Sequence, residues 1–234
     1  MNGIDCFMEG FRLVTKPGLR RYVIIPTLIN AIVLALMIVV SINEFSPWVE
    51  YLISFLPGWL SFLSWLIWVF ASLIVAFILF YLFTIVANII ASPFNALLSI
   101  KVEESLIGRS LASTVSLWMI LPRAIMREFS KLMYLLPRLI ALLLISVIPV
   151  VNAAAPFLWI IFSAWMMAVQ YADYAADNNE ISFSELRKRL AGKRFESILF
   201  GFPAYLMLAI PFVNLVLLPV AVAGGTVFWV KNLR

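Results

Sequence analysis

The chain has 234 residues, of which 64% are apolar or aromatic and only 12% are charged, and its net charge is +5. Because a soluble domain carries about 25% charged residues, this composition excludes a water-soluble protein and indicates an all-α integral membrane protein with one domain over residues 1–234. The absence of histidine and the single cysteine, Cys6, exclude imidazole catalysis and a thiolate zinc site, so we expect no metal, no cofactor and no enzymatic activity.

Residues 1–16 are expected to form an amphipathic helix that lies along the membrane surface. Apolar side chains recur there at helical spacing, at Ile4, Phe7, Met8 and Phe11, and the charged residues fall on other faces. Such a helix buries its apolar stripe at the boundary between lipid headgroups and acyl chains. A frayed tail is the alternative.

The first two membrane spans are expected where charges are absent. Residues 22–43 are uncharged and would form a helix of about 33 Å, which matches a hydrocarbon core of about 30 Å. This run is too long for a signal peptide and lacks a cleavage site of small residues. The uncharged stretch 51–100 is interrupted by Pro57-Gly58 and by Ser92-Pro93, so we expect a second, longer span over residues 59–91.

Residues 101–138 are expected to form a cytoplasmic helical segment. Arg123, Arg127 and Lys131 follow one another at intervals of four residues, so they share one face of a helix. Together with Glu103, the two arginines could line a vestibule for anions. A solvated or lipid-facing cytoplasmic helix, with Glu103 balancing nearby arginines, is the alternative.

Two uncharged runs, residues 139–172 and 197–230, are each 34 residues long. Two full spans with a turn need about 44 residues, whereas two helices of about 14–16 residues fit as a hairpin that enters and leaves on one side. Each run carries the pattern I-P-x-V-N near its middle, at 148–152 and 210–214, where proline ends a helix. We therefore expect two hemi-penetrating (re-entrant) helical hairpins, covered by protein or a water-filled cavity. Two pairs of short full spans are the alternative.

The segment between the hairpins, residues 173–196, is expected to be cytoplasmic. Asp173 and Asp177 have no electrophile or metal partner in the sequence, so we interpret them as capping a membrane exit. The basic run that begins at Arg187 is interpreted as an orientation signal. All 17 lysines and arginines then lie on one side, which places both termini in the cytoplasm and the loop 44–58 outside. The basic charge therefore needs no nucleic-acid partner.

The sequence K-P-G-L-R-R at residues 16–21 joins the surface helix to the first span. A Pro-Gly turn is expected to leave backbone N–H groups free at a helix start, where the helix dipole favours an anion. Two guanidinium groups can add bidentate contacts, so a doubly charged tetrahedral oxyanion would suit this turn. A plain anchor to lipid headgroups is the alternative.

Several motifs resemble the family of bacterial sulfate permeases and transporters known as CysZ, in the same order along nearly the whole chain. The motifs are K-P-G-L-R-R at 16–21, A-S-P-F-N at 91–95, Y-L-L-P-R at 134–138, F-S-A-W-M at 162–166, Q-Y-A-D-Y at 170–174 and P-V-A-V-A-G-G-T-V-F-W-V at 219–230. Two positions differ from the family pattern: Ala175 stands where proline is common, and Asn179 where histidine is common.

The resemblance implies two long transmembrane helices and two hemi-penetrating hairpins in a multi-pass protein of the bacterial inner membrane. It also implies a homo-oligomer that admits sulfate for assimilation into cysteine without nucleotide hydrolysis. It assigns the sulfate contact to Gly18, Leu19, Arg20 and Arg21. We therefore expect a sulfate channel or permease with weak sites along the path. A non-transporting membrane scaffold that shapes the bilayer is the alternative, and an intramembrane enzyme is the third.

Overall fold

The computed structural model describes residues 1–108, 117–208 and 213–234, with side chains at all of these except 117–125, 208 and 213–216. Within these ranges the chain is helical and forms no strand, which confirms the all-α class. The helices are α1 (Gly3–Val14), α2 (Arg21–Ser54), α3 (Ser64–Ile107), α4 (Leu117–Val147), α5 (Ala155–Asn178), α6 (Phe183–Gly192), α7 (Arg194–Leu208) and α8 (Val213–Phe228). Short turns of other helix types are η1 (Gly58–Leu63), η2 (Val151–Ala154) and η3 (Trp229–Leu233).

The length and apolar composition of the helices agree with a membrane protein. Four helical stretches of the described chain are long and apolar enough to cross a bilayer: Arg21–Ser54, Gly58–Ile107, Met126–Val147 and Val151–Asn178. The helices divide into two compact units. Unit 1 comprises Met1–Val23 and Pro93–Arg234, and unit 2 comprises Ile24–Ser92.

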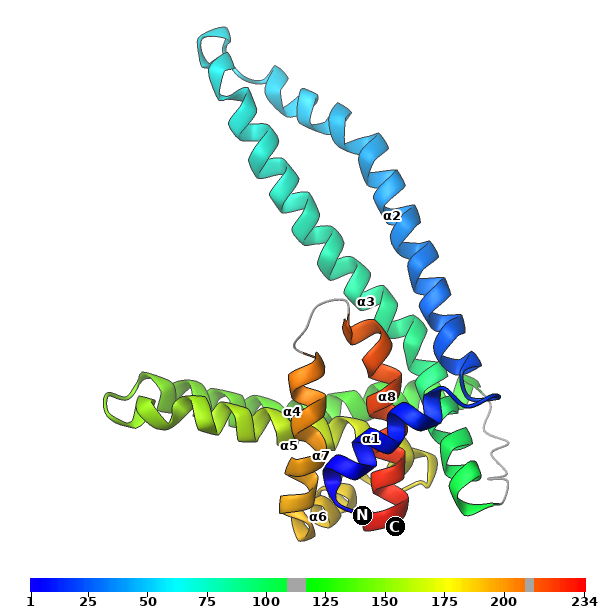
Figure 1. Cartoon of the computed structure of the whole chain (residues 1–234). Coiled ribbons are helices and arrows are strands. Elements are labelled where there is room, and N and C mark those ends of the chain that lie inside the picture. The colour runs from blue at the N-terminus through cyan, green and yellow to red at the C-terminus, as the bar shows by residue number, and fades with distance from the viewer. Residues whose placement is uncertain (109–116, 209–212) are drawn as a thin grey trace. The chain divides into compact units, whose positions relative to one another are not determined.

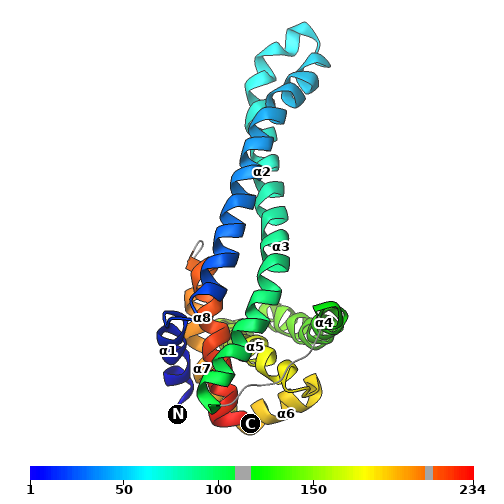
Figure 2. The ribbon, with the colours of Figure 1, turned by 90° about the vertical axis from the view of Figure 1, so that its right-hand side faces the viewer.

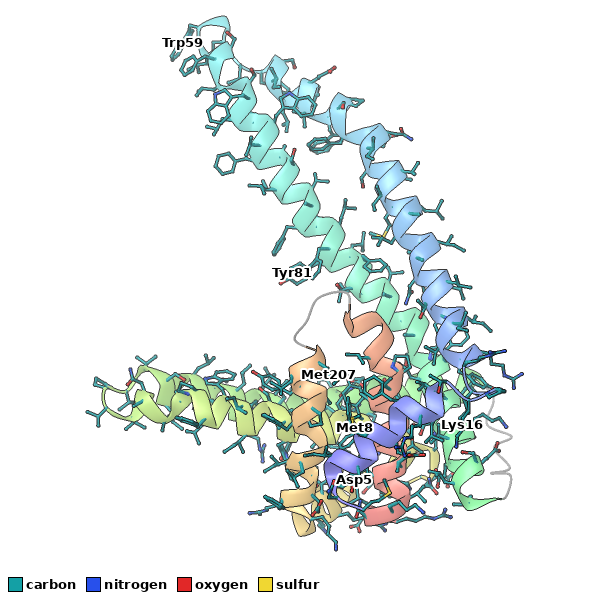
Figure 3. The ribbon with its side chains drawn as sticks, in the orientation of Figure 1. Asp5, Met8, Lys16, Trp59, Tyr81 and Met207 are labelled. Carbon is teal, nitrogen blue, oxygen red and sulfur yellow. The ribbon has the colours of Figure 1, made fainter. Side chains whose placement is uncertain are left out.

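Unit 2 is an antiparallel helical hairpin. Its two helices, from α2 and α3, run in opposite directions and are joined at the tip by η1 (Figure 1, Figure 2). Trp59 lies at this tip and is 75% exposed (Figure 3). Large apolar side chains along both helices, such as Leu36 and Phe77, are exposed as well. This surface suits helices whose surrounding solvent is lipid.

Both helices of unit 2 extend beyond the expected spans. α2 continues to Ser54, so the expected loop 44–58 is helical over most of its length. α3 continues through Pro93 to Ile107, so the helix break expected at 92–93 is wrong. A proline removes one backbone hydrogen bond, and the bonded turns on both sides can hold a long helix together around it. Charge marks where lipid ends, whereas the helix itself can extend past the bilayer.

In unit 1, the N-terminal helix α1 lies across α7 and α8 (Figure 1). Its buried face consists of Gly3, Cys6, Phe7, Gly10 and Leu13. Ile4 and Met8 remain 41% and 52% exposed, and Met8 is labelled on α1 in Figure 3. The apolar stripe expected to face lipid is therefore divided: Phe7 packs into the protein core, and Ile4 and Met8 stay outside.

Close backbone contact at glycines holds this arrangement. A Cβ added to Gly10 would lie 2.5 Å from the Val220 carbonyl oxygen of α8. In the same way, a Cβ at Gly201 of α7 would collide with the backbone of Ala164 on α5. Between membrane helices, small residues of this kind allow the backbones to approach closely, and van der Waals contact then stabilises the pair.

The first expected hairpin is formed by α4 and α5, which turn at the residues expected. α4 ends at Val147 and α5 begins at Ala155, and Val150 between them has φ +71°. The arms are longer than the expected half-length helices, with 31 residues in α4 and 24 in α5. They are longer because each helix continues into the charged segment beside it.

The second expected hairpin is formed by α7 and α8. Over the described residues, α7 and α8 have 15 and 16 residues, or about 22–24 Å each. Most of the expected turn at 210–214 lies outside the described residues, since the structure describes the chain to 208 and again from 213.

We expect Gly10→Ala to lower the thermal stability in detergent, because the new Cβ would force α1 away from α8. Overpacking of this kind costs about 1–3 kcal/mol. The matched control is Gly192→Ala, where no atom lies within 4 Å of the added Cβ. Melting followed by tryptophan fluorescence should occur at a lower temperature for Gly10→Ala alone. Equal melting temperatures for the two variants would contradict the packing of α1.

We expect Cys6 to resist maleimide at pH 7.5. Burial raises the pKa of its thiol from 9.0 to about 11, which lowers the reactive thiolate fraction roughly a hundredfold. The fraction of labelled protein is measured by mass spectrometry after fixed reaction times. Labelling should be slow for the native protein and fast after unfolding. Gly10→Ala should accelerate labelling without denaturant, whereas rapid labelling of the unaltered protein would contradict the docked position of α1.

Candidate anion-binding site

The motif K-P-G-L-R-R forms a tight turn between α1 and α2, within unit 1. Gly18 has φ +90°, which a residue with a Cβ rarely adopts, and an added Cβ would meet no atom within 4 Å. The backbone conformation, not crowding, therefore requires glycine here. Leu19 is only 7% exposed and belongs to the hydrophobic core of unit 1, so its side chain fixes the turn to the protein.

The backbone N–H groups of the turn are largely used by the turn itself. Those of Leu19 and Arg20 donate to the Lys16 carbonyl oxygen at 3.1 and 3.2 Å. The expectation that the Pro-Gly turn leaves its N–H groups free is therefore wrong for these two residues, because the turn closes with helix-like hydrogen bonds. The guanidinium groups are then the main donors that the motif offers to an anion.

The two arginines of the turn project away from the core. Arg20 and Arg21 are exposed, and within the described ranges no carboxylate forms an ion pair with either of them. Arg21 Nη2 donates to Tyr22 Oη at 3.0 Å, and its guanidinium lies 4.9 Å from the centroid of that ring. Lys16, which is labelled in Figure 3, is exposed beside them. The turn therefore concentrates positive charge at the surface of unit 1.

A second set of cations is paired inside unit 1, and we call it the α4–α5 charge cluster. It consists of Arg127, Lys131, Asp173 and Asp177. Arg127 Nη2 lies 2.7 Å from Asp173 Oδ1, and Arg127 Nη1 lies 3.2 Å from Asp177 Oδ1. Lys131 Nζ lies 2.9 Å from Asp173 Oδ2. The side chains of Arg127, Lys131 and Asp173 are 11%, 9% and 4% exposed, so these ion pairs are largely buried.

The charge cluster changes the interpretation of the expected vestibule. Arg127 is neutralised by two carboxylates and also donates to the Ile181 carbonyl oxygen at 2.8 Å, so its charge stabilises the protein. Arg123 lies in α4, but its side chain is outside the described residues. Asp173 and Asp177, interpreted from the sequence as capping a membrane exit, are instead counter-ions of α4.

Glu103, the remaining expected vestibule residue, is fully buried at the end of α3. Its Oε1 lies 3.4 Å from Arg234 Nη1, and its Oε2 accepts a hydrogen bond from Asn179 Nδ2 at 2.8 Å. A buried carboxylate needs such partners to remain charged. Glu103 therefore connects α3, the end of α5 and the C-terminal segment within unit 1.

The sequence contains a signal for the charge cluster in the spacing of its charges. Arg127 and Lys131 are four residues apart, and so are Asp173 and Asp177, so each pair lies on one helix face with the same spacing. Two such pairs of opposite charge match when their helices are adjacent. The chain separates Arg127 from Asp173 by 46 residues, and only the packing of α4 beside α5 brings them together.

Comparisons with known proteins give one consistent result. The family described as "Sulfate transporter CysZ/Etoposide-induced protein 2.4" matches residues 6–219. The "Sulfate transporter CysZ" of Pseudomonas aeruginosa strain PAO1 is 47% identical over 99% of this chain and 96% of its own length. The protein of the same name from Pectobacterium atrosepticum is 41% identical over 100% of this chain and 86% of its own length. The similarity therefore extends over both units. It also includes the turn from Gly18 to Arg21, which we call the basic turn.

We expect Asp173→Asn to destabilise the protein strongly, because Lys131 and Arg127 would lose a buried counter-ion. Breaking a buried ion pair costs about 3–5 kcal/mol. The control is Glu9→Gln, which removes an exposed pair with Arg12 that should contribute at most about 1 kcal/mol. Thermal unfolding in detergent should separate the two variants clearly. A small, equal change in both would show that the charge cluster does not hold α4 against α5.

Proposed function

The chain belongs to the family of sulfate transporter CysZ and etoposide-induced protein 2.4, and we propose that it carries sulfate across a bacterial inner membrane for assimilation into cysteine. The family expected from the sequence motifs is thereby confirmed. The observation that carries the proposal is identity of 41–47% with proteins named sulfate transporters, over nearly the whole chain. These names describe transporters and not enzymes, and they favour transport over the alternative of a non-transporting scaffold.

The proposed sulfate contact is the basic turn, Gly18 to Arg21. Two kinds of cation in unit 1 support this choice by their contrast. Arg127 and Lys131 are buried and satisfied by carboxylates, so an anion would have to displace those partners. Arg20 and Arg21 are exposed and unpaired by any carboxylate of the described residues, so their charge is available to an external anion.

In the proposed mechanism, the two guanidinium groups bind the oxygens of sulfate, and the fixed turn orients them. Gly18 supplies the left-handed backbone, and Leu19 anchors it in the core. Charge-assisted hydrogen bonds of this kind suit a tetrahedral dianion. Because the site is exposed, water competes with each contact and binding stays weak, which allows the ion to leave toward the next site. Removal of sulfate in the cytoplasm then maintains its inward gradient.

We also propose how the chain lies in the membrane. Its 17 lysines and arginines spare the stretch 44–58, which favours cytoplasmic termini and an external tip of unit 2. The described lengths of α7 and α8, together with the 34-residue uncharged run that holds most of both, favour a hairpin that enters the bilayer without crossing it. A water-filled path beside such a hairpin would be lined by several helices, and a homo-oligomer would complete it.

We expect Arg20→Ala/Arg21→Ala to reduce sulfate uptake into proteoliposomes by about tenfold at low sulfate, because two exposed charged contacts together contribute about 1–2 kcal/mol. Uptake of labelled sulfate measures this directly. The matched control is Lys193→Ala/Lys231→Ala, which removes the same charge from two exposed positions outside the turn and should leave uptake unchanged.

Two outcomes would contradict parts of the proposal separately. Unchanged uptake by the double arginine variant would reject the site and leave transport standing. No uptake by the unaltered protein, correctly inserted in the same vesicles, would reject transport itself. Melting temperatures of both variants in detergent test whether a loss of uptake reflects misfolding.

A further inference from the structure

A groove in unit 1 carries positive charge that the proposed sulfate contact does not use. It has a volume of about 680 Å³ and lies between α4, α5, α6 and the start of α7; we call it the basic groove. Four cations line it: Arg138, Arg187, Lys188 and Arg194. None of the residues that line it within the described ranges is acidic. The basic groove is thus a strongly cationic surface without an internal counter-charge.

Two of these cations are held in place by one tyrosine. The guanidinium of Arg138 lies 3.6 Å from the ring centroid of Tyr134, and that of Arg187 lies 4.7 Å from it. Trp165 fixes the same tyrosine, since its Nε1 donates to Tyr134 Oη at 3.0 Å. Cation–π contacts orient the two guanidinium groups but do not neutralise them. Two positive groups are therefore preorganised at one end of the basic groove.

The Nε of Arg187 is a buried donor at the edge of the basic groove. It is buried, and it donates to no acceptor among the described residues. The neighbouring carboxylate of Glu185 is already engaged with Arg189 Nε at 3.1 Å. A buried donor left unsatisfied costs free energy, and burial near other cations increases that cost. A negatively charged ligand with several acceptor oxygens would remove both penalties.

The rest of the basic groove is apolar. Its wall follows α4 from Arg138 to Ile145 and α5 from Trp165 to Leu158, which is seven residues or about 10 Å along each helix. Ile161, also in this wall, is 49% exposed. Polarity therefore changes along the basic groove, from cations at one end to an aliphatic surface at the other. A small inorganic anion would leave that aliphatic surface without a partner.

We propose that the basic groove binds an anionic glycerophospholipid, with its phosphate on Arg187, Lys188 and Arg194 and an acyl chain along α4 and α5. The charge selects an anionic headgroup over a zwitterionic one, since each cation near an anionic lipid contributes to binding. The aliphatic wall selects a lipid over a soluble phosphate or sulfate. The bound lipid would occupy the space between the α4–α5 hairpin and the two helices α6 and α7.

The test is lipid retention and stabilisation of the purified full chain in detergent. Dioleoylphosphatidylglycerol should remain bound in native mass spectrometry and raise the melting temperature. Dioleoylphosphatidylcholine, which has the same chains, and glycerol 3-phosphate, which has an anionic head without chains, should do neither. Sulfate is the fourth ligand tested. Because it is the ligand proposed for the basic turn, its effect distinguishes binding at that turn from binding in the basic groove.

The variant for this test is Lys188→Gln/Arg194→Gln, since both side chains are exposed and their replacement leaves the core intact. It should retain about tenfold less phosphatidylglycerol than the unaltered protein. Lys193→Gln/Lys231→Gln removes the same charge outside the basic groove and should retain lipid normally. Trp165 adds a second readout: brominated phosphatidylglycerol should quench tryptophan fluorescence less in Trp165→Phe than in the unaltered protein.

Three results would overturn the proposal. Equal retention of phosphatidylglycerol by both double variants would remove the basic groove from lipid binding. Equal stabilisation by glycerol 3-phosphate or sulfate, lost in Lys188→Gln/Arg194→Gln, would assign the basic groove to a small anion. A change of oligomeric mass in that variant, with lipid retention unaltered, would assign this surface to a second copy of the chain.

Discussion

In a bilayer, apolar side chains gain nothing by leaving lipid for one another, so helices associate through close packing and through polar contacts. Unit 1 uses both. Backbone contact at Gly10 joins α1 to α8, and contact at Gly201 joins α7 to α5. The ion pairs of Asp173 add α4 to the same group. Leu19 is fixed in the core that these contacts create, so the basic turn owes its position to glycines that never touch an anion.

The cations of unit 1 fall into two groups, which the net charge of the chain does not distinguish. Arg127 and Lys131 form ion pairs with carboxylates of the protein. These pairs compensate for the removal of the two cations from water. The cations of the basic turn and of the basic groove form no such ion pair within the described residues, and the two sites differ in their surroundings. The turn is open to water and suits an ion in transit. The groove has an aliphatic wall and suits a ligand that stays.

The sequence predicted the helical class, two long apolar helices and the turn between α4 and α5 well, because charge and proline depend directly on solvent and backbone. It predicted helix ends poorly, since Pro93 interrupts neither the hydrogen bonding around it nor the run of α3. The motif with Arg20 and Arg21 could be recognised locally. The pairing of Arg127 with Asp173 could not, because it depends on which helices are adjacent. Leu19 illustrates the same limit: the Pro-Gly sequence predicts a turn, but it does not predict that the Lys16 carbonyl accepts the Leu19 amide.

The packing of α1 against α8 has a consequence for biogenesis. These two helices lie near opposite ends of the sequence, so the glycine face of α1 has no partner while the ribosome is still making the segments between them. Contacts between distant segments form late, because the intervening chain must first be ordered. The hydrophobic spans can insert one after another as they emerge, whereas α1 docks only once α8 is in place. The basic turn at the end of α1 therefore reaches its final position only after insertion.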